Sequence, residues 1–343
     1  MTPPSLSIII TNHNYARYVV SAVSSALAQD GAEVVVVDDG SGDDSLERLA
    51  PFDDRVTIVR QDNGGQGAAM NAGLARCTAP VTMFLDADDV LAPGIGAAVR
   101  RHFEDPSVAR VHFPLRRVDA DGAPTGGTVP PDPAALPHGD LGERVRRHPH
   151  DVAWQPTSGN AYRRSVLDAV LPVPEAEYRT CADHHLNALT ALHGRVVTEP
   201  TVGGDYRVHG QNVDARESFD LARVQGIVAR SRHTETAVAD HARTLGFRAV
   251  RPRSVSVCAN RILSLRLGAE THPIDGDSVP SALLDGLRAS TARFDLRPRR
   301  RLAAAGFVLA LAAGPRRALP RLAERFLTGT TDLPSTVSTS SGG

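Results

Sequence analysis

The N-terminal third of the chain alternates between short, continuous apolar runs and amphipathic segments. The apolar runs have the length of buried strands, and the segments between them repeat apolar residues at helix spacing. We expect strands over residues 6–10, 34–37, 56–59 and 81–85, and helices over 15–28, from 45 onward and over 68–75. Strands and helices that alternate with short connections predict an α/β fold, a doubly wound, mostly parallel sheet with flanking helices.

Polar residues follow each of the four expected strands. The carboxyl ends of parallel strands meet at one edge of the sheet, where open α/β sheets bind their ligands. This topology brings Thr11, Asp39, Asn63 and Asp86 to one crevice. Four polar strand ends at one edge favour a binding site over four unrelated solvated turns.

The fourth strand ends in three carboxylates, Asp86, Asp88 and Asp89. Crowded carboxylates repel one another unless a cation or a donor-rich ligand compensates them. A hard divalent ion held by one or two carboxylates and by substrate phosphates is a common solution. The alternative is an acidic turn that binds nothing.

Composition narrows the classes of function. The net charge is −1, so the totals give no sign of a nucleic-acid partner. Every basic residue of the Lys+Arg count is arginine, which excludes Walker A and Schiff-base lysines. The cysteines Cys77, Cys181 and Cys258 are widely spaced, which favours a reducing, cytoplasmic setting. The first residues lack the charged and apolar regions of a signal peptide, so we expect none.

Four motifs resemble, in order and spacing, those of family 2 glycosyltransferases with the GT-A fold. They are SIIITNHNY from Ser7, VVDDGSGD from Val36, NGGQGAAMNAGL from Asn63 and FLDADD from Phe84. The resemblance implies an inverting, metal-dependent enzyme that moves a sugar from a nucleotide-sugar donor, a UDP-sugar, to a hydroxyl acceptor. A glycan, a lipid-linked glycan or a small molecule would be the acceptor, in cell-surface polysaccharide or secondary-metabolite glycosylation.

The resemblance also assigns donor contacts to the strand ends. Thr11 and Asp39 would hold the nucleotide base, and His13 stands where an aromatic residue often packs on it. Asp86 would contact the ribose or the donor, and Asn63 belongs to the same donor-binding set. An acceptor such as the Asp39 carboxylate suits the N–H of uracil.

A divalent metal, Mn²⁺ or Mg²⁺, is implied beside the donor diphosphate. Asp88 would bind it, and His209 lies in a Tyr-Arg-x-His-x-x-Asn segment that is common in the family. That histidine would close over the diphosphate or reach the metal, or else be satisfied by backbone groups. Met70 departs from the family, which often has an arginine there.

Two later segments are expected on the acceptor side of the cleft. Trp154 and Asn160 lie in a stretch that resembles the family's acceptor segment, where Trp154 would stack on a sugar ring, although a lone tryptophan is more often a core or interface residue. Before them, residues 119–140 are rich in Pro, Gly and Asp and predict a long loop.

Asp183 is the expected general base. Relatives place an acidic pair here whose second member is the base, whereas this chain has Ala182 and Asp183. The alternatives are that Asp183 only caps a helix, or that His184 is the base.

Beyond residue 219 the sequence predicts helices, over 219–245 and 255–267 among others. Residues 302–313 are apolar and bounded by arginines, too short for a bilayer, which needs about twenty residues. They fit either a core helix or one that lies in a membrane interface as a peripheral contact. We expect a GT-A domain over 1–215, a helical extension over 216–328 and a disordered tail over 329–343.

Two other functions stay open. A sugar nucleotidyltransferase usually has a glycine-rich loop and a basic residue after its first strand, and Thr11–Asn14 has neither. A non-catalytic sugar-nucleotide-binding protein would explain Met70 and the missing acid beside Asp183. The segment Asp86–Val90 also resembles a haloacid-dehalogenase phosphatase motif, but such phosphatases use a lysine, which this chain lacks.

Overall fold

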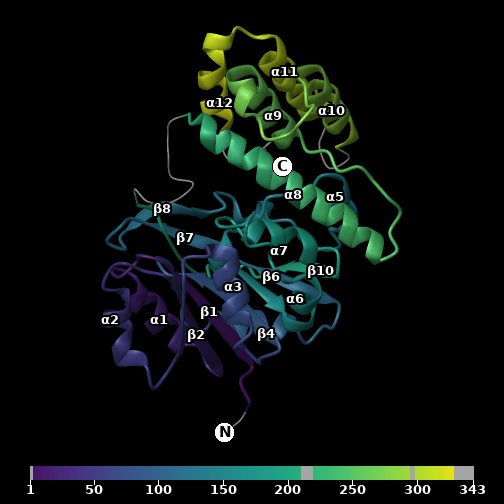
Figure 1. Cartoon of the computed structure of the whole chain (residues 1–343). Coiled ribbons are helices and arrows are strands. Elements are labelled where there is room, and N and C mark those ends of the chain that lie inside the picture. The colour runs from purple at the N-terminus through teal and green to yellow at the C-terminus, as the bar shows by residue number, and fades with distance from the viewer. Residues whose placement is uncertain (1–2, 210–218, 294–297, 328–343) are drawn as a thin grey trace, which may run out of the picture. The chain divides into compact units, whose positions relative to one another are not determined.

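The computed structural model describes residues 3–209, 219–293 and 298–327. They form two compact units, one of residues 3–142 and 154–209, the other of residues 143–153 and the described residues after 209 (Figure 1). The expected tail and the last residues of the histidine motif, from 210 on, lie outside the described ranges.

The first unit is built on a seven-stranded sheet in the order β10-β6-β9-β4-β1-β2-β3. Only β9 runs antiparallel to its neighbours, so the expected mostly parallel α/β sheet is confirmed. All four strands expected in the N-terminal third are present. The strands of this sheet are β1 (Leu6–Asn12), β2 (Ala32–Asp39), β3 (Thr57–Gln61), β4 (Val81–Asp86), β6 (Val108–His112), β9 (Asn160–Arg163) and β10 (Arg195–Thr198).

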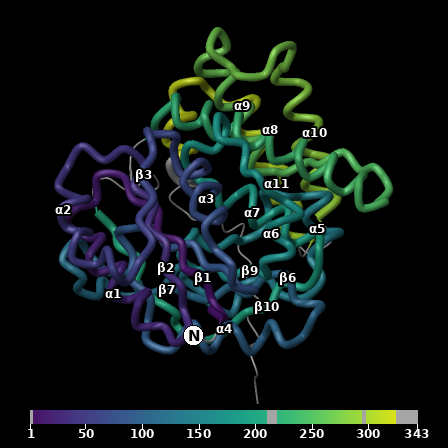
Figure 2. The backbone as a smooth tube through the Cα atoms, turned by 60° about the horizontal axis from the view of Figure 1, so that its bottom comes forward, coloured from purple at the N-terminus to yellow at the C-terminus, as the bar shows by residue number. Residues whose placement is uncertain are grey.

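Helices cover both faces of this sheet because its strands are apolar on both sides. In β1, Ile8 and Ile10 pack in one cluster with Val23 of α1, whereas Ile9 faces α3. Gly73 of α3 lies so close that an added Cβ would be 2.3 Å from Ile9 Cγ2. Figures 1 and 2 show these flanking helices. They are α1 (Val19–Leu27), α2 (Ser45–Leu49), α3 (Gln66–Leu74), α4 (Ile95–His102), α6 (Arg164–Val170) and α7 (Asp183–Thr190).

A second, four-stranded sheet follows the order β5-β11-β7-β8. Its strands are β5 (Val90–Leu91), β7 (Leu115–Val118), β8 (Pro124–Val129) and β11 (Gly204–Arg207). The prediction of a long loop over 119–140 is therefore wrong in part, because β8 pairs antiparallel with β7. Asp119 accepts hydrogen bonds from the backbone N–H groups of Asp121 and Ala123, and Gly122 has a φ of 87°. The Pro, Gly and Asp residues thus form a hairpin turn.

The second unit is helical, and the helices expected over 219–245 and 255–267 are confirmed. Its apolar core joins Val224, Ile262, Ala282 and Val308. In the described part of the chain no helix is both long and apolar enough to cross a membrane. The helices are α5 (Gly142–Arg147, whose first residue belongs to the other unit), α8 (Leu221–Thr244), α9 (Val255–Gly268), α10 (Val279–Ala292), α11 (Pro298–Ala313) and α12 (Leu319–Leu327).

Candidate functional site

The carboxyl ends of β1, β2 and β4 lie side by side, as the sequence predicts. Thr11 is paired in register with Val37 on one side and with Asp86 on the other. The Thr11 hydroxyl donates to Asp86 Oδ1 at 3.4 Å, and the Asp86 backbone N–H donates to Ser158 Oγ at 3.1 Å. The strand ends thus bring these polar groups to one edge of the sheet.

Asp39 shapes the loop that follows β3. Its Oδ1 accepts from Gln61 Nε2 at 2.7 Å and from the Gly64 N–H at 2.8 Å, and its Oδ2 accepts from the Gly65 N–H at 2.7 Å. Gly65 has a φ of 90°, which a side chain would disfavour. Both carboxylate oxygens therefore already accept hydrogen bonds from other groups of the protein, and Asp39 holds the glycine-rich loop in place.

His13 and Asn63 meet beside this loop. His13 Nδ1 donates to the Asp39 carbonyl oxygen at 2.8 Å, and the Asn63 side-chain amide donates to His13 Nε2 at 3.0 Å. Arg179, from the segment before α7, donates to the Asn63 carbonyl oxygen at 3.2 Å. All the residues proposed for the donor, from Thr11 to Asp86, thus gather at these strand ends.

Negative charge is crowded at the end of β4. Burial, together with the charges of Asp88 and Asp183, raises the pKa of Asp86 to about 7. Burial and the charges of Asp88 and Asp86 raise the pKa of Asp89 well above its usual range. Burial and these carboxylates also raise the pKa of the Tyr15 hydroxyl. The site therefore favours a ligand that brings positive charge.

Asp88 and His209 are in direct contact. Asp88 lies between β4 and β5, and His209 follows β11, which pairs with β5 through Asp205 and Val90. His209 Nε2 donates to Asp88 Oδ2 at 2.9 Å, with side-chain exposures of 6% and 10%. The pairing of β11 with β5 thus brings together two residues that are far apart in sequence.

Aromatic rings enclose the histidine of this pair. The ring of Tyr18 stacks on His209 at 5.4 Å between centroids, and the ring of Tyr15 meets it edge-on at 5.7 Å. The Arg207 guanidinium lies over Tyr18, and its Nε donates to the Asp88 carbonyl oxygen at 2.8 Å. These contacts fix the direction of the imidazole.

The donor set fits a divalent ion that also binds substrate. The described residues contain no group of three or more His, Cys, Asp or Glu side chains that would enclose a metal by itself. Asp88 and His209 supply two donors, and Mg²⁺-type ions often take one or two protein ligands plus phosphate oxygens and water. The raised carboxylate pKa values mark an excess of negative charge that such an ion would relieve.

Asp183 is the first residue of α7, and Ala182 occupies the N-cap position. A carboxylate in the first turn is stabilised by the helix dipole. Gln66 ties this point to the donor side, because its Oε1 accepts from the Ala182 N–H at 2.9 Å and its Nε2 donates to Asp86 Oδ1 at 3.0 Å. The sequence by itself indicates no role for Gln66, although it lies within a family motif, because a bridge between distant segments leaves no local pattern.

The two acceptor-side residues differ in exposure. Trp154 is partly exposed, and the guanidinium of Arg110 lies over its ring at 4.5 Å. Asn160 is fully buried, and its side-chain amide donates to the carbonyl oxygens of Gln155 at 3.2 Å and Pro156 at 2.8 Å. Asn160 thus supports the chain next to Trp154 from within the fold.

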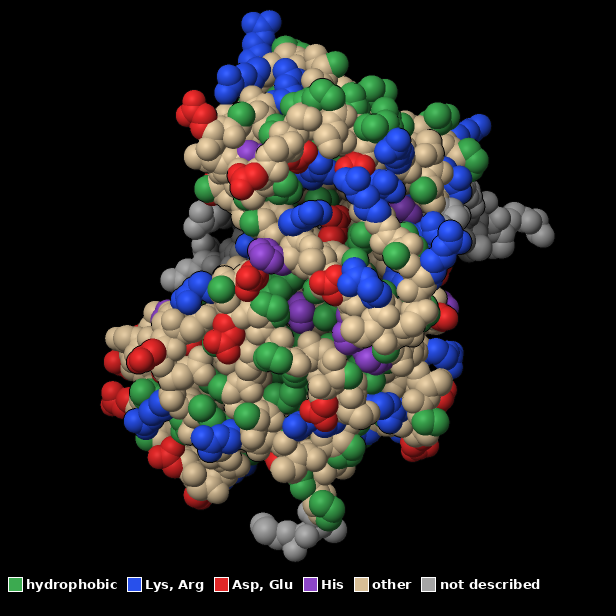
Figure 3. Space-filling model, turned by 45° about the vertical axis from the view of Figure 1, so that its right-hand side comes forward, with side chains coloured by type: hydrophobic (Ala, Val, Ile, Leu, Met, Phe, Trp, Pro, Cys, Tyr) green, Lys and Arg blue, Asp and Glu red, His purple; other side chains and the backbone are tan. Residues whose placement is uncertain are grey.

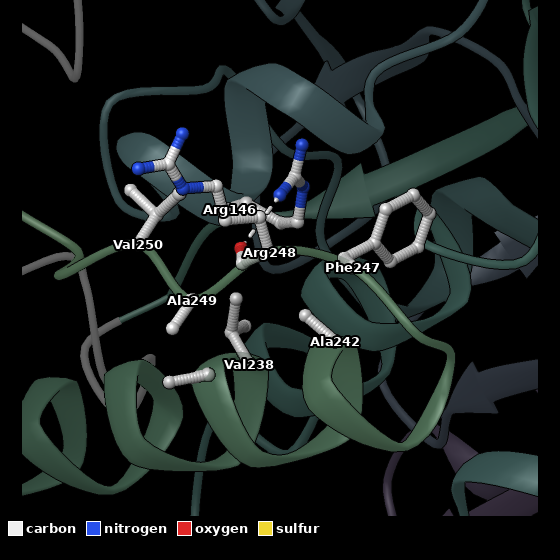
Figure 4. Close-up of a pocket in the computed structure, with 8 residues that line it drawn as sticks. Arg146, Val238, Ala242, Phe247, Arg248, Ala249 and Val250 are labelled. Atoms are coloured by element: carbon white, nitrogen blue, oxygen red, sulfur yellow. Dashed lines mark hydrogen bonds between the residues drawn. The ribbon is translucent and has the colours of Figure 1, made fainter.

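The helical unit has a small pocket of its own (Figure 4). Arg146 lies over the ring of Phe247, with 4.6 Å from guanidinium to ring centre, and the remaining lining is mostly apolar. The lining contains no carboxylate, histidine or cysteine, so it offers no group for proton transfer or nucleophilic attack. The lining residues are Arg146, Val238, Ala239, Ala242, Phe247, Arg248, Ala249 and Val250.

Residues 7–171 match the profile of the family described as Glycosyl transferase family 2. The chain belongs to this family. An uncharacterised glycosyltransferase of Nostoc is 37% identical over 215 residues, which cover 60% of this chain and 66% of that protein. The succinoglycan biosynthesis protein ExoU of Rhizobium meliloti is 44% identical over 97 residues, 27% of this chain and 28% of ExoU. The chain thus matches less than two thirds of the length of these curated relatives.

Solved structures place this family 2 protein in the GT-A fold. Residues 1–349 of Staphylococcus aureus TarS superpose with a TM-score of 0.54 at 16% identity, over 95% of this chain and 92% of that one. A mannosyltransferase of Pyrobaculum calidifontis, bound to GDP-mannose and Mn²⁺, gives 0.50 at 21% identity, over 98% and 89%. At this identity the likeness shows the fold, a mixed GT-A sheet with flanking helices and a helical C-terminal region.

Removing the Gln66 bridge should loosen the start of α7. In Gln66→Leu the buried Ala182 N–H and the Asp86 carboxylate both lose a partner, which should lower the free energy of unfolding by about 1–3 kcal/mol. Amide hydrogen exchange should rise at the first turn of α7. Gln61→Leu is the matched control, because it removes a glutamine that contacts Asp39 and leaves α7 protected. Unchanged exchange at α7 in Gln66→Leu would contradict the bridging role.

Proposed function

We propose that this chain is an inverting glycosyltransferase that moves a sugar from a nucleotide-sugar donor to an acceptor hydroxyl. The observation that carries the proposal is the arrangement around Gln66. One end of its amide contacts Asp86, at the strand ends that gather the donor-binding candidates, and the other contacts the backbone next to Asp183. A donor site and a candidate base are thus held at a fixed separation, which a transfer reaction between two bound substrates requires.

The donor we propose is a UDP-sugar. TarS has been solved with UDP and with UDP-GlcNAc, whereas the Pyrobaculum enzyme binds GDP-mannose, so relatives of this fold use both nucleotides. The cluster of His13, Asn63 and Arg179 presents amide, imidazole and guanidinium groups at the place where the base would lie. These groups would recognise the edge of a nucleotide base.

Asp183 is the residue that we propose as general base. It is partly exposed and stands at the positive end of α7, and Arg110, which stacks on Trp154, acts electrostatically on it. It would take the proton of the acceptor hydroxyl while that oxygen attacks the anomeric carbon. The bond from this carbon to the diphosphate oxygen breaks on the opposite face, which inverts the configuration.

Asp88 and His209 would hold the divalent ion, Mn²⁺ or Mg²⁺. When bound, the ion supplies positive charge that neutralises the departing nucleoside diphosphate. Tyr15, Tyr18 and Arg207 hold this pair in place and exclude water from one side of it. The Mn²⁺ in the Pyrobaculum structure supports the same choice of ion.

The acceptor we propose is a growing glycan or lipid-linked glycan. Similar proteins include the succinoglycan biosynthesis protein of Rhizobium meliloti and a chondroitin synthase of Escherichia coli, 35% identical over 125 residues. Trp154 offers a partly exposed indole face, which suits stacking on a sugar ring.

Metal dependence tests the donor half of this mechanism. Asp88→Asn removes one ligand charge, so turnover of the nucleotide sugar should fall about 10²- to 10³-fold, together with affinity for Mn²⁺ and donor. Asp168→Asn, an exposed aspartate on α6, is the matched control and should behave as wild type. Full sugar transfer in the presence of EDTA, or by Asp88→Asn, would contradict the metal-dependent mechanism. Donor binding without any turnover in the wild type would show a non-catalytic binder.

The base assignment makes a separate prediction. Asp183→Asn keeps the shape of the side chain but cannot accept a proton, so turnover should fall about 10²- to 10⁴-fold. Donor affinity and melting temperature should stay close to wild type, because the donor contacts and the Ala182 N-cap are untouched. His184→Ala tests the rival base. Normal turnover in Asp183→Asn together with collapse in His184→Ala would transfer the role to the histidine.

A peripheral membrane contact is the partner that we propose for α11. From Leu302 to Ala313 the exposed positions of this helix carry only apolar or small residues, while arginines occupy positions 299–301 at its start and 316–317 just beyond its end. Figure 3 shows hydrophobic side chains next to arginine side chains on one face of the molecule. Leu302 is 73% exposed and Leu309 46% exposed on this face. Such a helix suits the interface of an anionic bilayer, whereas a second copy of α11 would bring like charges together in either direction.

Sedimentation with vesicles tests this contact. The protein should sediment with phosphatidylglycerol vesicles at low salt and less at high salt, because screening weakens the arginine contacts. The double variant Leu302→Glu and Leu309→Glu should lose binding, whereas Leu245→Glu, a 40% exposed leucine just after α8, should retain it. Equal sedimentation of both variants would exclude α11 as the contact.

A further inference from the structure

A charged residue lies at the centre of a buried strand. Arg110 is the middle residue of β6 and is 0% exposed. Burying a charge is costly unless the charge is paired and hydrogen-bonded. Yet Nε and Nη2 of Arg110 donate to no protein atom within the described ranges. A buried guanidinium kept at this cost calls for an explanation beyond the stability of the sheet.

The Arg110 side chain contacts the helix that begins with Asp183. Its Nη1 donates to the side-chain oxygen of Asn187, which lies four residues after Asp183 and therefore on the same face of α7. The same oxygen accepts from the Tyr162 hydroxyl at 2.9 Å, and the Asn187 amide nitrogen donates to the Gln155 carbonyl oxygen at 3.0 Å. Asn187 is 0% exposed, so these bonds fix the rotation of α7 from inside the fold.

Arg110 also contacts Trp154, one of the two residues proposed to meet the acceptor, and acts electrostatically on the other, Asp183. Its guanidinium stacks on Trp154 at 4.5 Å, a cation–π contact. Burial lowers the pKa of Arg110 to about 10, and the negative charge of Asp183 acts against this shift. The charge of Asp183 also contributes to a raised pKa of Tyr162, after burial. The positive charge of Arg110 thus acts on the Asp183 carboxylate.

We propose that Arg110 is a positioning residue for the base: through Asn187 it sets the direction of Asp183, and through its fixed charge it keeps that carboxylate ionised. The inference rests on the proposed function. Charged or titratable groups that act on Asp183 include Asp86 from β4, Arg110 from β6 and Tyr162 from β9, and His184 follows it directly on α7. The negative charge of Asp86 disfavours ionisation of Asp183, whereas the positive charge of Arg110 favours it. Arginine suits this task because it stays charged at all relevant pH values and stacks on an aromatic face.

The test compares turnover across pH in variants of Arg110. Arg110→Met keeps the bulk of the side chain but removes the charge, so the acidic limb of the kcat profile should move up by about one pH unit or more. On the acidic limb itself kcat should fall about tenfold for each pH unit of the shift, with the donor KM unchanged. Arg110→Lys retains the charge, so its acidic limb should stay at the wild-type pH while kcat falls through the lost stacking. Asn187→Ala retains Arg110, so it should lower kcat without moving the limb.

Arg163→Met is the matched control. Arg163 lies on the neighbouring strand β9, stacks on Phe103 at 5.5 Å and donates to backbone carbonyl oxygens. Its loss should lower the melting temperature and leave the acidic limb in place. Wild-type turnover is measured first, and its absence would refute the proposed function rather than the role of Arg110.

With an active wild type, four results overturn the inference. The first is an unmoved acidic limb in a folded Arg110→Met variant, and the second is an equal shift in Arg163→Met. The third is a limb that moves in Arg110→Lys, and the fourth is a normal kcat in Asn187→Ala. If Arg110→Met fails to fold, Arg110→Lys and Asn187→Ala decide.

Discussion

Repulsion among carboxylates at the end of β4 is the constraint on which the rest of the site depends. Asp86, Asp88, Asp89 and Asp183 lie close enough to act on one another, and burial adds to the cost of their charges. Separate hydrogen-bond donors compensate the charge of the individual carboxylates. His209 donates to Asp88, the Arg207 backbone N–H donates to Asp89 at 2.9 Å, and Gln66 donates to Asp86. The compensation stays incomplete, as the raised pKa values show, and this leaves room for a cationic ligand.

The fold holds these charges together by joining segments that are distant in sequence. The large sheet places Thr11 next to Asp86, and the small sheet brings His209 to Asp88. Without the pairing of β11 with β5, Asp88 would lack its imidazole partner. The second sheet is therefore part of the site, although its strand β8 lies in a segment that we predicted as loop.

Periodicity correctly located the strands β1 to β4 and the long helices α8 and α9, because apolar spacing reports local structure directly. The order of strand ends also predicted that Thr11, Asp39, Asn63 and Asp86 would gather, since parallel strands end at one edge. The hairpin of β7 and β8 escaped prediction, because its turn and its glycine-rich strand share the composition of a loop. Assignments of single residues to donor, metal or base remain predictions.

The sequence by itself determined the α/β class, the family motifs and the acidic strand end, since each is written in residues close together along the chain. Only the tertiary structure decided that Gln66 bridges Asp86 to α7, that Asn160 is buried, and that buried Arg110 bonds Asn187 on the helix that begins with Asp183. The segment Val108–His112 reads as a short strand whether or not its arginine has a partner. The contacts of Arg110 with Asn187 and of Gln66 with Ala182 join residues more than seventy positions apart, and the tertiary fold rather than local spacing brings them together.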